Sequence, residues 1–87
     1  MNYYDMSISE LRDYRAKKLI EYYVKREDYM ELCDRGLYIR NKKDKEEFNK
    51  KLETIDNEIF ALGDLINGLD NLIHSKERQR IINSLKK

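Results

Sequence analysis

The chain has 87 residues, which is enough for one domain and too few for two. Charged residues make up 40% of it and apolar residues another 40%, so it is too apolar for a disordered tail and too charged for a thick globular core. The formal net charge of +1 provides no overall field that would attract nucleic acid or an anionic membrane.

The residues that break or cross-link structure are scarce. There is no proline, and there are three glycines and one cysteine, Cys33, so a helical fold without internal disulfides is expected. The first residues lack the basic and apolar regions of a signal peptide. The longest apolar run, residues 59–62, is far shorter than the roughly 20 residues of a membrane span. These features favour a cytoplasmic protein that does not enter the membrane, and the richness in Lys, Asn, Ile and Tyr suits an AT-rich bacterial or phage genome.

A first helix is predicted over about residues 7–35. Ser7 and Glu10 have the spacing of a capping box, in which each side chain bonds to the backbone amide of the other residue. Met6 and Leu11 have the spacing of a hydrophobic staple across the same turn. Gly36 is expected to take the left-handed conformation that ends many helices.

A second helix is predicted over about residues 44–74, after a connection of residues 36–43. Asp44 and Glu47 form a possible capping box, with Asn41 as the alternative cap. Apolar residues then recur at alternating intervals of four and three, which is the spacing of a coiled-coil seam. The seam consists of Phe48, Leu52, Ile55, Ile59, Leu62, Ile66, Leu69 and Ile73.

The first helix has a less regular stripe with the same spacing. Its apolar members are Ala16, Leu19, Tyr23, Met30, Cys33 and Leu37. Arg12 and Arg26 fall on the stripe as well, and Ile20, Tyr22 and Tyr29 widen it. The two arginines are interpreted as side chains whose stems cover apolar surface while the guanidinium groups reach water. The alternative is that they fix the pairing register or meet a partner's carboxylate.

Two helices of nearly equal length with a short connection predict an antiparallel pair. The seam fails beyond Ile73, and Ser75 can cap a short third helix over about residues 75–86. The alternative is that the second helix continues with a rotated stripe. The predicted fold is therefore all-α: one domain, residues 1–87, forming a coiled-coil-like helical hairpin with a short C-terminal helix.

The second helix has more apolar surface than one antiparallel neighbour can cover. Leu65 and Leu72 flank the seam near Leu69, and Phe60 lies further round. Three apolar positions per heptad suit a bundle of three or four helices. We therefore expect a homodimer that forms a helical bundle through Phe60, Leu65, Leu69 and Leu72.

No constellation of catalytic or metal-binding residues is recognisable in the sequence. His74 is the only histidine, and no second His or Cys lies near it. The sequence indicates no base that would activate Cys33 as a catalytic nucleophile, so this cysteine is interpreted as a small core residue. The acidic residues alternate with lysines on helix faces away from the seam. We therefore predict a protein that is not an enzyme and that uses no metal or cofactor.

The function expected from these features is binding of another protein by a small regulator, adaptor or inhibitor, of the kind that phages and mobile elements encode. Exposed aromatic and basic residues near the ends of the helices are the candidate partner-binding residues: Tyr3, Tyr4, Tyr38, Arg40, Arg78 and Arg80. The alternative is an accessory nucleic-acid-binding protein, because residues 75–87 hold five Lys and Arg against one Glu. A third possibility is a structural coiled-coil element of a larger assembly.

Overall fold

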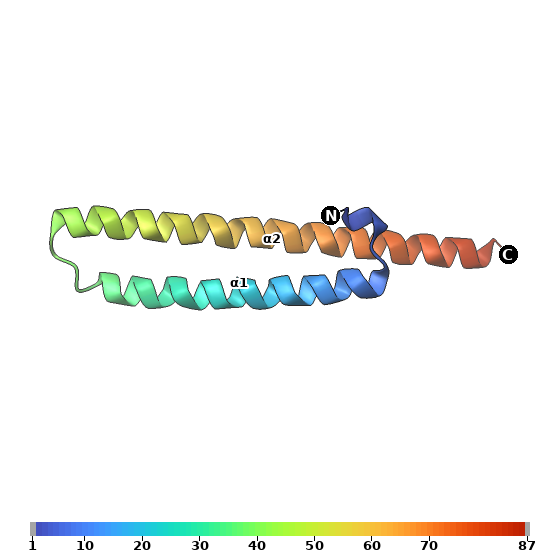
Figure 1. Ribbon diagram of the computed structural model, residues 1–87, viewed down its shortest axis with the longest axis horizontal. Coiled ribbons are helices and arrows are strands. Elements are labelled where there is room, and N and C mark those ends of the chain that lie inside the picture. Colours follow the sequence, from blue (N-terminus) through green and yellow to red (C-terminus); the bar gives the residue numbers. More distant parts are fainter. Residues whose placement is uncertain (1, 87) are drawn as a thin grey trace.

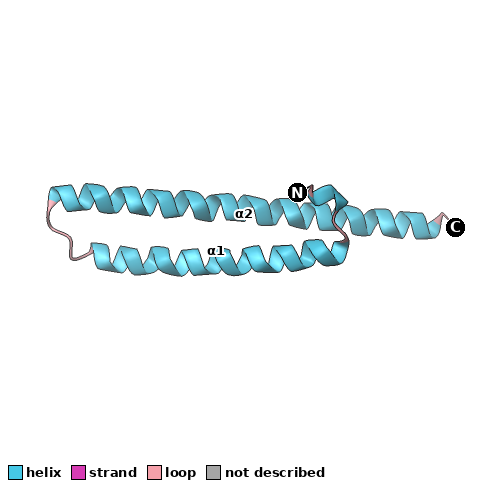
Figure 2. Ribbon diagram, in the orientation of Figure 1, coloured by secondary structure: helices cyan, strands magenta, loops and turns pink. Residues whose placement is uncertain are grey.

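The computed structural model describes residues 2–86 and contains two long helices within them. A short 3-10 turn, η1 (Tyr3–Asp5), precedes α1 (Ile8–Gly36), which is followed by α2 (Lys42–Leu85). The helices run side by side in opposite directions, and α2 continues well past the start of α1 (Figure 1). The resulting rod measures 69 × 18 × 17 Å. The prediction of an all-helical chain is confirmed, with no strand in the described residues (Figure 2).

The start of α1 agrees with the sequence prediction. The Ser7 hydroxyl accepts from the Glu10 amide, and the Glu10 carboxylate accepts from the Ser7 amide, which completes the capping box. Met6 packs against the cluster that contains Leu11, and Leu11 is fully buried. This closed first turn fixes the direction from which residues 2–6 reach the helix pair.

Gly36 ends α1 in a way that the sequence analysis did not predict. No residue in the described chain has a positive φ, so the expected left-handed cap is wrong. Gly36 is the last helical residue, and a Cβ atom on it would lie only 2.4 Å from the ring of Phe48. The glycine is therefore explained by the close approach of α2 rather than by backbone conformation.

The N-terminus of α2 is capped by Asn41, the alternative that the sequence allowed. The Asn41 side chain accepts from the Lys43 amide at 2.9 Å, and the helix begins at Lys42, two residues before the Asp44 start. The connection is correspondingly shorter than predicted, spanning residues 37–41.

The predicted break near His74 and Ser75 does not exist. α2 is one helix of 44 residues that ends at Leu85, so the separate C-terminal helix over residues 75–86 is wrong. The segment after Ser75 begins with good helix formers, from Lys76 to Arg80, and contains neither glycine nor proline. The alternative, continuation of the second helix, is correct, because the backbone needs no apolar seam to remain helical.

All eight seam positions of α2 are buried or half-buried, so the predicted α2 seam is confirmed. The stripe predicted for α1 is wrong by one residue. The residues that are buried or half-buried with seam spacing are Ile8, Leu11, Arg15, Lys18, Tyr22, Lys25, Tyr29, Leu32 and Gly36. Three of the residues on the predicted stripe, Tyr23, Met30 and Leu37, are exposed instead.

Ion pairs between the helices explain this rotation. Arg15 pairs with Asp70, and Lys25 pairs with Glu58, so charged α1 seam residues meet acidic residues beside the α2 seam. Their aliphatic stems cover the contact line while their charged ends reach those carboxylates. A prediction based only on apolar residues selects the wrong face of α1, because it does not assign Arg15 and Lys25 to a seam.

The buried residues are confined to one part of the molecule. Among the described residues the buried hydrophobic ones are Leu11, Ile66, Leu69 and Ile73. Three of them, Leu11, Leu69 and Ile73, form the cluster against which Tyr3 and Met6 pack. Elsewhere the helices have a single contact line, and the seam residues remain half-buried.

Candidate interaction surfaces

The N-terminal segment, residues 2–6, folds back against α2. The hydroxyl groups of Tyr3 and Tyr14 lie 3.3 Å apart, and their ring centroids are separated by 5.5 Å. The hydrogen bond between them raises the pKa of Tyr3 above its ordinary value. Tyr3, which the sequence analysis placed among the partner-binding residues, therefore packs within its own chain.

Lys76 holds the same segment from the opposite helix. Its ammonium group donates to the backbone carbonyl oxygens of Tyr4 and Met6, at 2.6 and 2.7 Å. These charge-assisted bonds satisfy two acceptors just before the first helix begins. Tyr4 itself remains 73% exposed, so it is still available to a partner.

The N-terminal segment also covers much of the surface expected to form a dimer. Leu65 and Leu72 are half-buried and, with Tyr3, pack against a cluster that includes Leu69. Leu69 is 2% exposed and is therefore unavailable to a second molecule. The proposed dimer surface of Phe60, Leu65, Leu69 and Leu72 is thus largely occupied by the chain's own N-terminus. Of these four residues only Phe60, which is 72% exposed, stands open.

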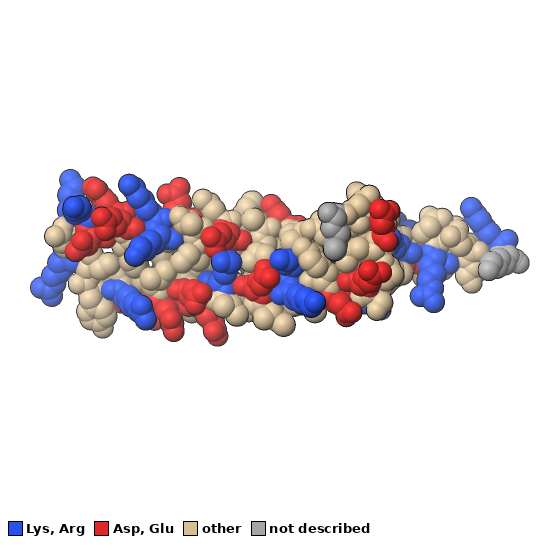
Figure 3. All heavy atoms as spheres, in the orientation of Figure 1, with Lys and Arg blue, Asp and Glu red and all other residues tan. Residues whose placement is uncertain are grey.

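The end of α2 projects beyond α1, and residues 78–85 are defined here as the overhang. Every residue of the overhang is exposed, including Arg78 and Arg80. All 17 acidic residues and 14 of the 18 Lys and Arg lie in residues 1–77, so that part carries −3 and residues 78–87 carry +4. In Figure 3 the overhang shows blue side chains and no red ones, whereas both colours are mixed over the helix pair.

The connection between the helices forms a further surface. Leu37 and Tyr38 are 81% and 84% exposed, and Arg40 is exposed beside them. The connection lies at the end of the rod opposite the overhang (Figure 1). The six candidate residues therefore occupy three separate places, and no single partner-binding patch gathers them.

A shallow groove on the helix pair was missed by the sequence analysis. It is lined by Tyr22 of α1 and by Ile59, Phe60 and Gly63 of α2, with three polar residues, Asp56, Asp64 and Asn67, around them. A Cβ atom on Gly63 would meet only the Tyr22 ring, at 3.7 Å, so the missing side chain leaves the surface open there. The sequence signal that could have indicated this groove is Gly63, which follows Phe60, an apolar residue outside the seam, by three residues.

Ion pairs and a cation–π contact lie beside these surfaces. Arg12, near the start of α1, pairs with Glu77, the residue that directly precedes the overhang. The hydrogen bond to Glu58 raises the pKa of Lys25, which keeps this lysine charged beside α2. The Arg26 guanidinium lies 5.6 Å from the centroid of the Tyr22 ring. Arg12 thus meets a carboxylate of its own chain, whereas Arg26 covers an aromatic ring.

The residues with possible reactive chemistry lie apart from one another. Within residues 2–86 there is no group of three or more His, Cys, Asp and Glu side chains that could hold a metal ion. His74 is exposed, with Nδ1 4.0 Å from a Glu77 oxygen, and Cys33 is half-buried. Electrostatic interaction with Cys33, together with burial, raises the pKa of Tyr29. Neither α1 nor α2 contains an apolar stretch that could cross a membrane.

Exposed apolar and basic groups are spread along the rod. Its main features are an exposed apolar groove, a basic overhang and an apolar connection. Comparison with known proteins adds no relative to this description. No protein-family model, no curated protein and no solved structure matches the chain.

Proposed function

We propose that this chain is a non-enzymatic protein-binding module, a regulator, adaptor or inhibitor that acts through the surface of a coiled-coil-like helical hairpin. The observation that supports this proposal most directly is the distribution of large apolar side chains. Eleven of them are exposed, whereas four hydrophobic residues are buried in the described chain. Where such exposed side chains lie together, as Ile81 and Leu85 do on the overhang, contiguous apolar surface is typical of proteins that bind other macromolecules.

Self-association is part of the same proposal. A two-helix arrangement has one contact line and no closed interior, so most of its seam side chains stay half-exposed. Bundles of four helices bury three apolar positions per heptad. A homodimer would supply the missing cover and could leave the connection at one end of the rod for other proteins.

The test for partner binding uses Leu37 and Tyr38 of the connection, because these side chains are 81% and 84% exposed. Leu37→Ser combined with Tyr38→Ser should retain the helical content of the wild type and lose partners captured from host extract. Lys50→Ala combined with Lys51→Ala changes an exposed pair on α2 and serves as the control. Equal capture by the wild type and both double variants, quantified by mass spectrometry, would remove the connection as a binding surface.

A second candidate function is accessory binding of nucleic acid by the overhang. The overhang contains Arg78 and Arg80, Lys86 follows it directly, and residues 78–86 contain no acidic residue. Binding through such a segment weakens steeply as salt concentration rises, because phosphate contacts release counterions. Retention on heparin no stronger than that of an acidic control protein would exclude it.

A further inference from the structure

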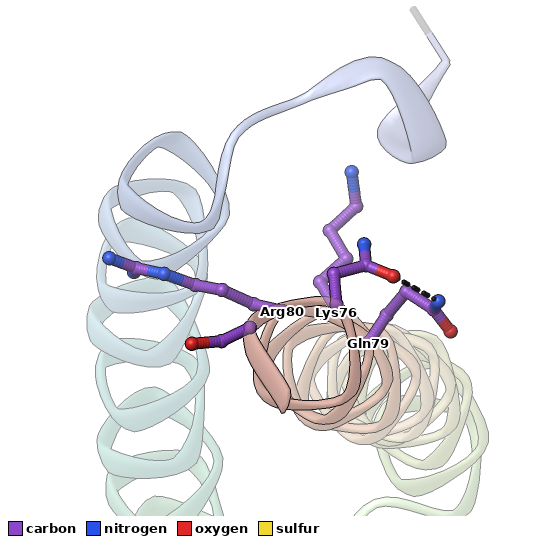
Figure 4. Close-up of a pocket in the computed structure, with 5 residues that line it drawn as sticks. Lys76, Gln79 and Arg80 are labelled. Carbon is purple, nitrogen blue, oxygen red and sulfur yellow. Dashed lines mark hydrogen bonds between the residues drawn. The ribbon is translucent and has the colours of Figure 1, made fainter. Parts of the chain in front are cut away.

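The overhang has two chemically different sides. Figure 4 looks along α2 and shows Arg80 directed toward α1 and Lys76 directed toward the N-terminal segment. Gln79 lies further round and donates a hydrogen bond to Asn83 at 3.1 Å. Ile81 and Leu85, 61% and 81% exposed, lie on another side, because each residue advances about 100° around a helix. An apolar stripe therefore follows the overhang on the side away from the N-terminal segment.

This stripe belongs to a second seam along α2. Successive residues are spaced alternately by four and three, as in the seam that packs against α1. Its members are Phe60, Asp64, Asn67, Asn71, His74, Arg78, Ile81 and Leu85, and all eight are exposed. Apolar residues stand at both ends and polar residues stand in the middle. Such a pattern fits the same seam of an antiparallel second copy. The Phe60 end of one copy then meets the Ile81 and Leu85 end of the other.

The charges at the two ends of this second seam are opposite. Asp56 and Asp64 line the groove around Phe60, and no Lys or Arg lines it. Arg78 stands at the other end, on the overhang. Asp64 and Arg78 are 14 residues apart on one continuous helix, which is about 21 Å. They cannot pair within one chain, but they can pair between two chains.

We propose that the occupant of the groove is the overhang of a second copy of this chain, in a reciprocal antiparallel dimer. Leu85 of one copy packs beside Phe60 of the other, and Arg78 lies within reach of Asp64. Near the two-fold axis His74 of one copy faces Asn71 of the other. Polar residues at such seam positions specify the pairing register. This inference rests on the self-association proposed above and names the surface and the register.

The two-fold arrangement uses each complementary surface twice. The overlap extends from residue 60 to residue 85 of each copy, which is about 38 Å of paired helix. Gly63 permits close approach beside the groove, since only the Tyr22 ring lies within 4 Å of its missing Cβ. The dimer also covers the apolar side of an overhang that has no neighbour in its own chain. The surface first expected to form the dimer, around Leu69, remains occupied by the N-terminal segment.

The first test is charge reversal, read as molar mass by light scattering at micromolar concentration. The wild type is expected to be a dimer. Arg78→Glu and Asp64→Arg should each weaken dimerisation about tenfold or more, because each creates two like-charge contacts per dimer. The two substitutions combined should restore it. Arg80→Glu makes the same charge change on the side that faces α1, and it should leave the dimer intact. Equal weakening by Arg78→Glu and Arg80→Glu would overturn the proposed pairing and would indicate a general charge effect.

The second test measures the register by disulfide formation between copies in a Cys33→Ser background. Asn67 of one copy is placed opposite Arg78 of the other, so a mixture of Asn67→Cys and Arg78→Cys chains should form a mixed disulfide on oxidation. Each variant alone should not, because its two cysteines would lie about 16 Å apart. A mixture of Asn57→Cys and Arg78→Cys chains is the control. Residue 57 lies about 15 Å along the helix from residue 67, so this mixture should not form the mixed disulfide.

The outcomes separate this inference from the proposal on which it rests. A wild-type dimer without a preferred Asn67–Arg78 disulfide overturns the register, while self-association stands. A wild-type mass equal to one chain overturns both. A mixed disulfide above the control, together with restored dimerisation in the double charge reversal, supports both.

Discussion

The two ends of the paired region are built from the same kind of seam but are packed differently. Near the start of α1, residues 2–6 lie across the helices, and Leu11, Leu69 and Ile73 form a buried cluster. Near the connection none of the described residues forms a third segment, and Leu52 and Ile55 stay half-buried. The difference shows that two helices alone form a contact line, and that a short third segment converts this line into a core.

Truncating seam residues at the two ends should give the largest effect. Leu69→Ala removes a side chain that is 2% exposed, and it should lower the free energy of unfolding by about 2–5 kcal/mol. Ile55→Ala changes a half-buried residue of the same seam and should cost about half as much, because less surface and a smaller cavity are involved. Urea unfolding followed by circular dichroism measures both changes. Equal losses would mean that the N-terminal segment does not form a core in solution.

Glycine substitutions sharpen the comparison at the connection end. Gly68→Ala adds a methyl group that meets nothing within 4 Å, so it should stabilise α2 by about 0.5–1 kcal/mol. Gly36→Ala places a Cβ atom 2.4 Å from the Phe48 ring, which must move. Its stability should therefore be at least about 1 kcal/mol below that of Gly68→Ala.

A second background identifies the cause of that difference. In Phe48→Leu protein the ring is absent, and the deficit of Gly36→Ala relative to Gly68→Ala should shrink. Thermal unfolding of the four glycine variants, two in each background, is sufficient. An undiminished deficit would show that backbone conformation, rather than contact with Phe48, disfavours a side chain at residue 36.

The sequence predicts the helices better than it predicts their facing sides. The capping box at Ser7 depends only on neighbouring residues, and the seam of α2 repeats through eight positions. Both predictions are confirmed by the structure. The seam of α1 depends on which carboxylates of α2 its Arg and Lys reach. Arg15–Asp70 and Lys25–Glu58 are contacts between residues far apart in sequence, and apolar periodicity contains no information about them.

The candidate binding residues show the same limit. Tyr38 and Arg78 are exposed, as their places near the ends of helices indicate. Tyr3 folds back onto its own chain because Lys76 holds the carbonyls of Tyr4 and Met6, a contact across more than 60 residues. The groove beside Gly63 was missed because it depends on the rotation of α1. Local signals identify exposed residues, but only packing shows which of them remain free.

The smallest expected effect concerns the hydroxyl pair at the N-terminal end. The hydrogen bond to Tyr14 raises the pKa of Tyr3 above its ordinary value of 10.0, so folding favours the protonated form. The stabilisation is complete below pH 10.0, and it is lost as the pH rises through the higher pKa of the folded state. Tyr3→Phe lacks this ionisable group, so the difference in unfolding free energy between wild type and variant should shift in favour of the variant from pH 9 to pH 11. Because both proteins share every other tyrosine and lysine, a constant difference over this range would mean that Tyr3 is not hydrogen-bonded in solution. The N-terminal segment would then be held by the two Lys76 contacts and by apolar packing alone.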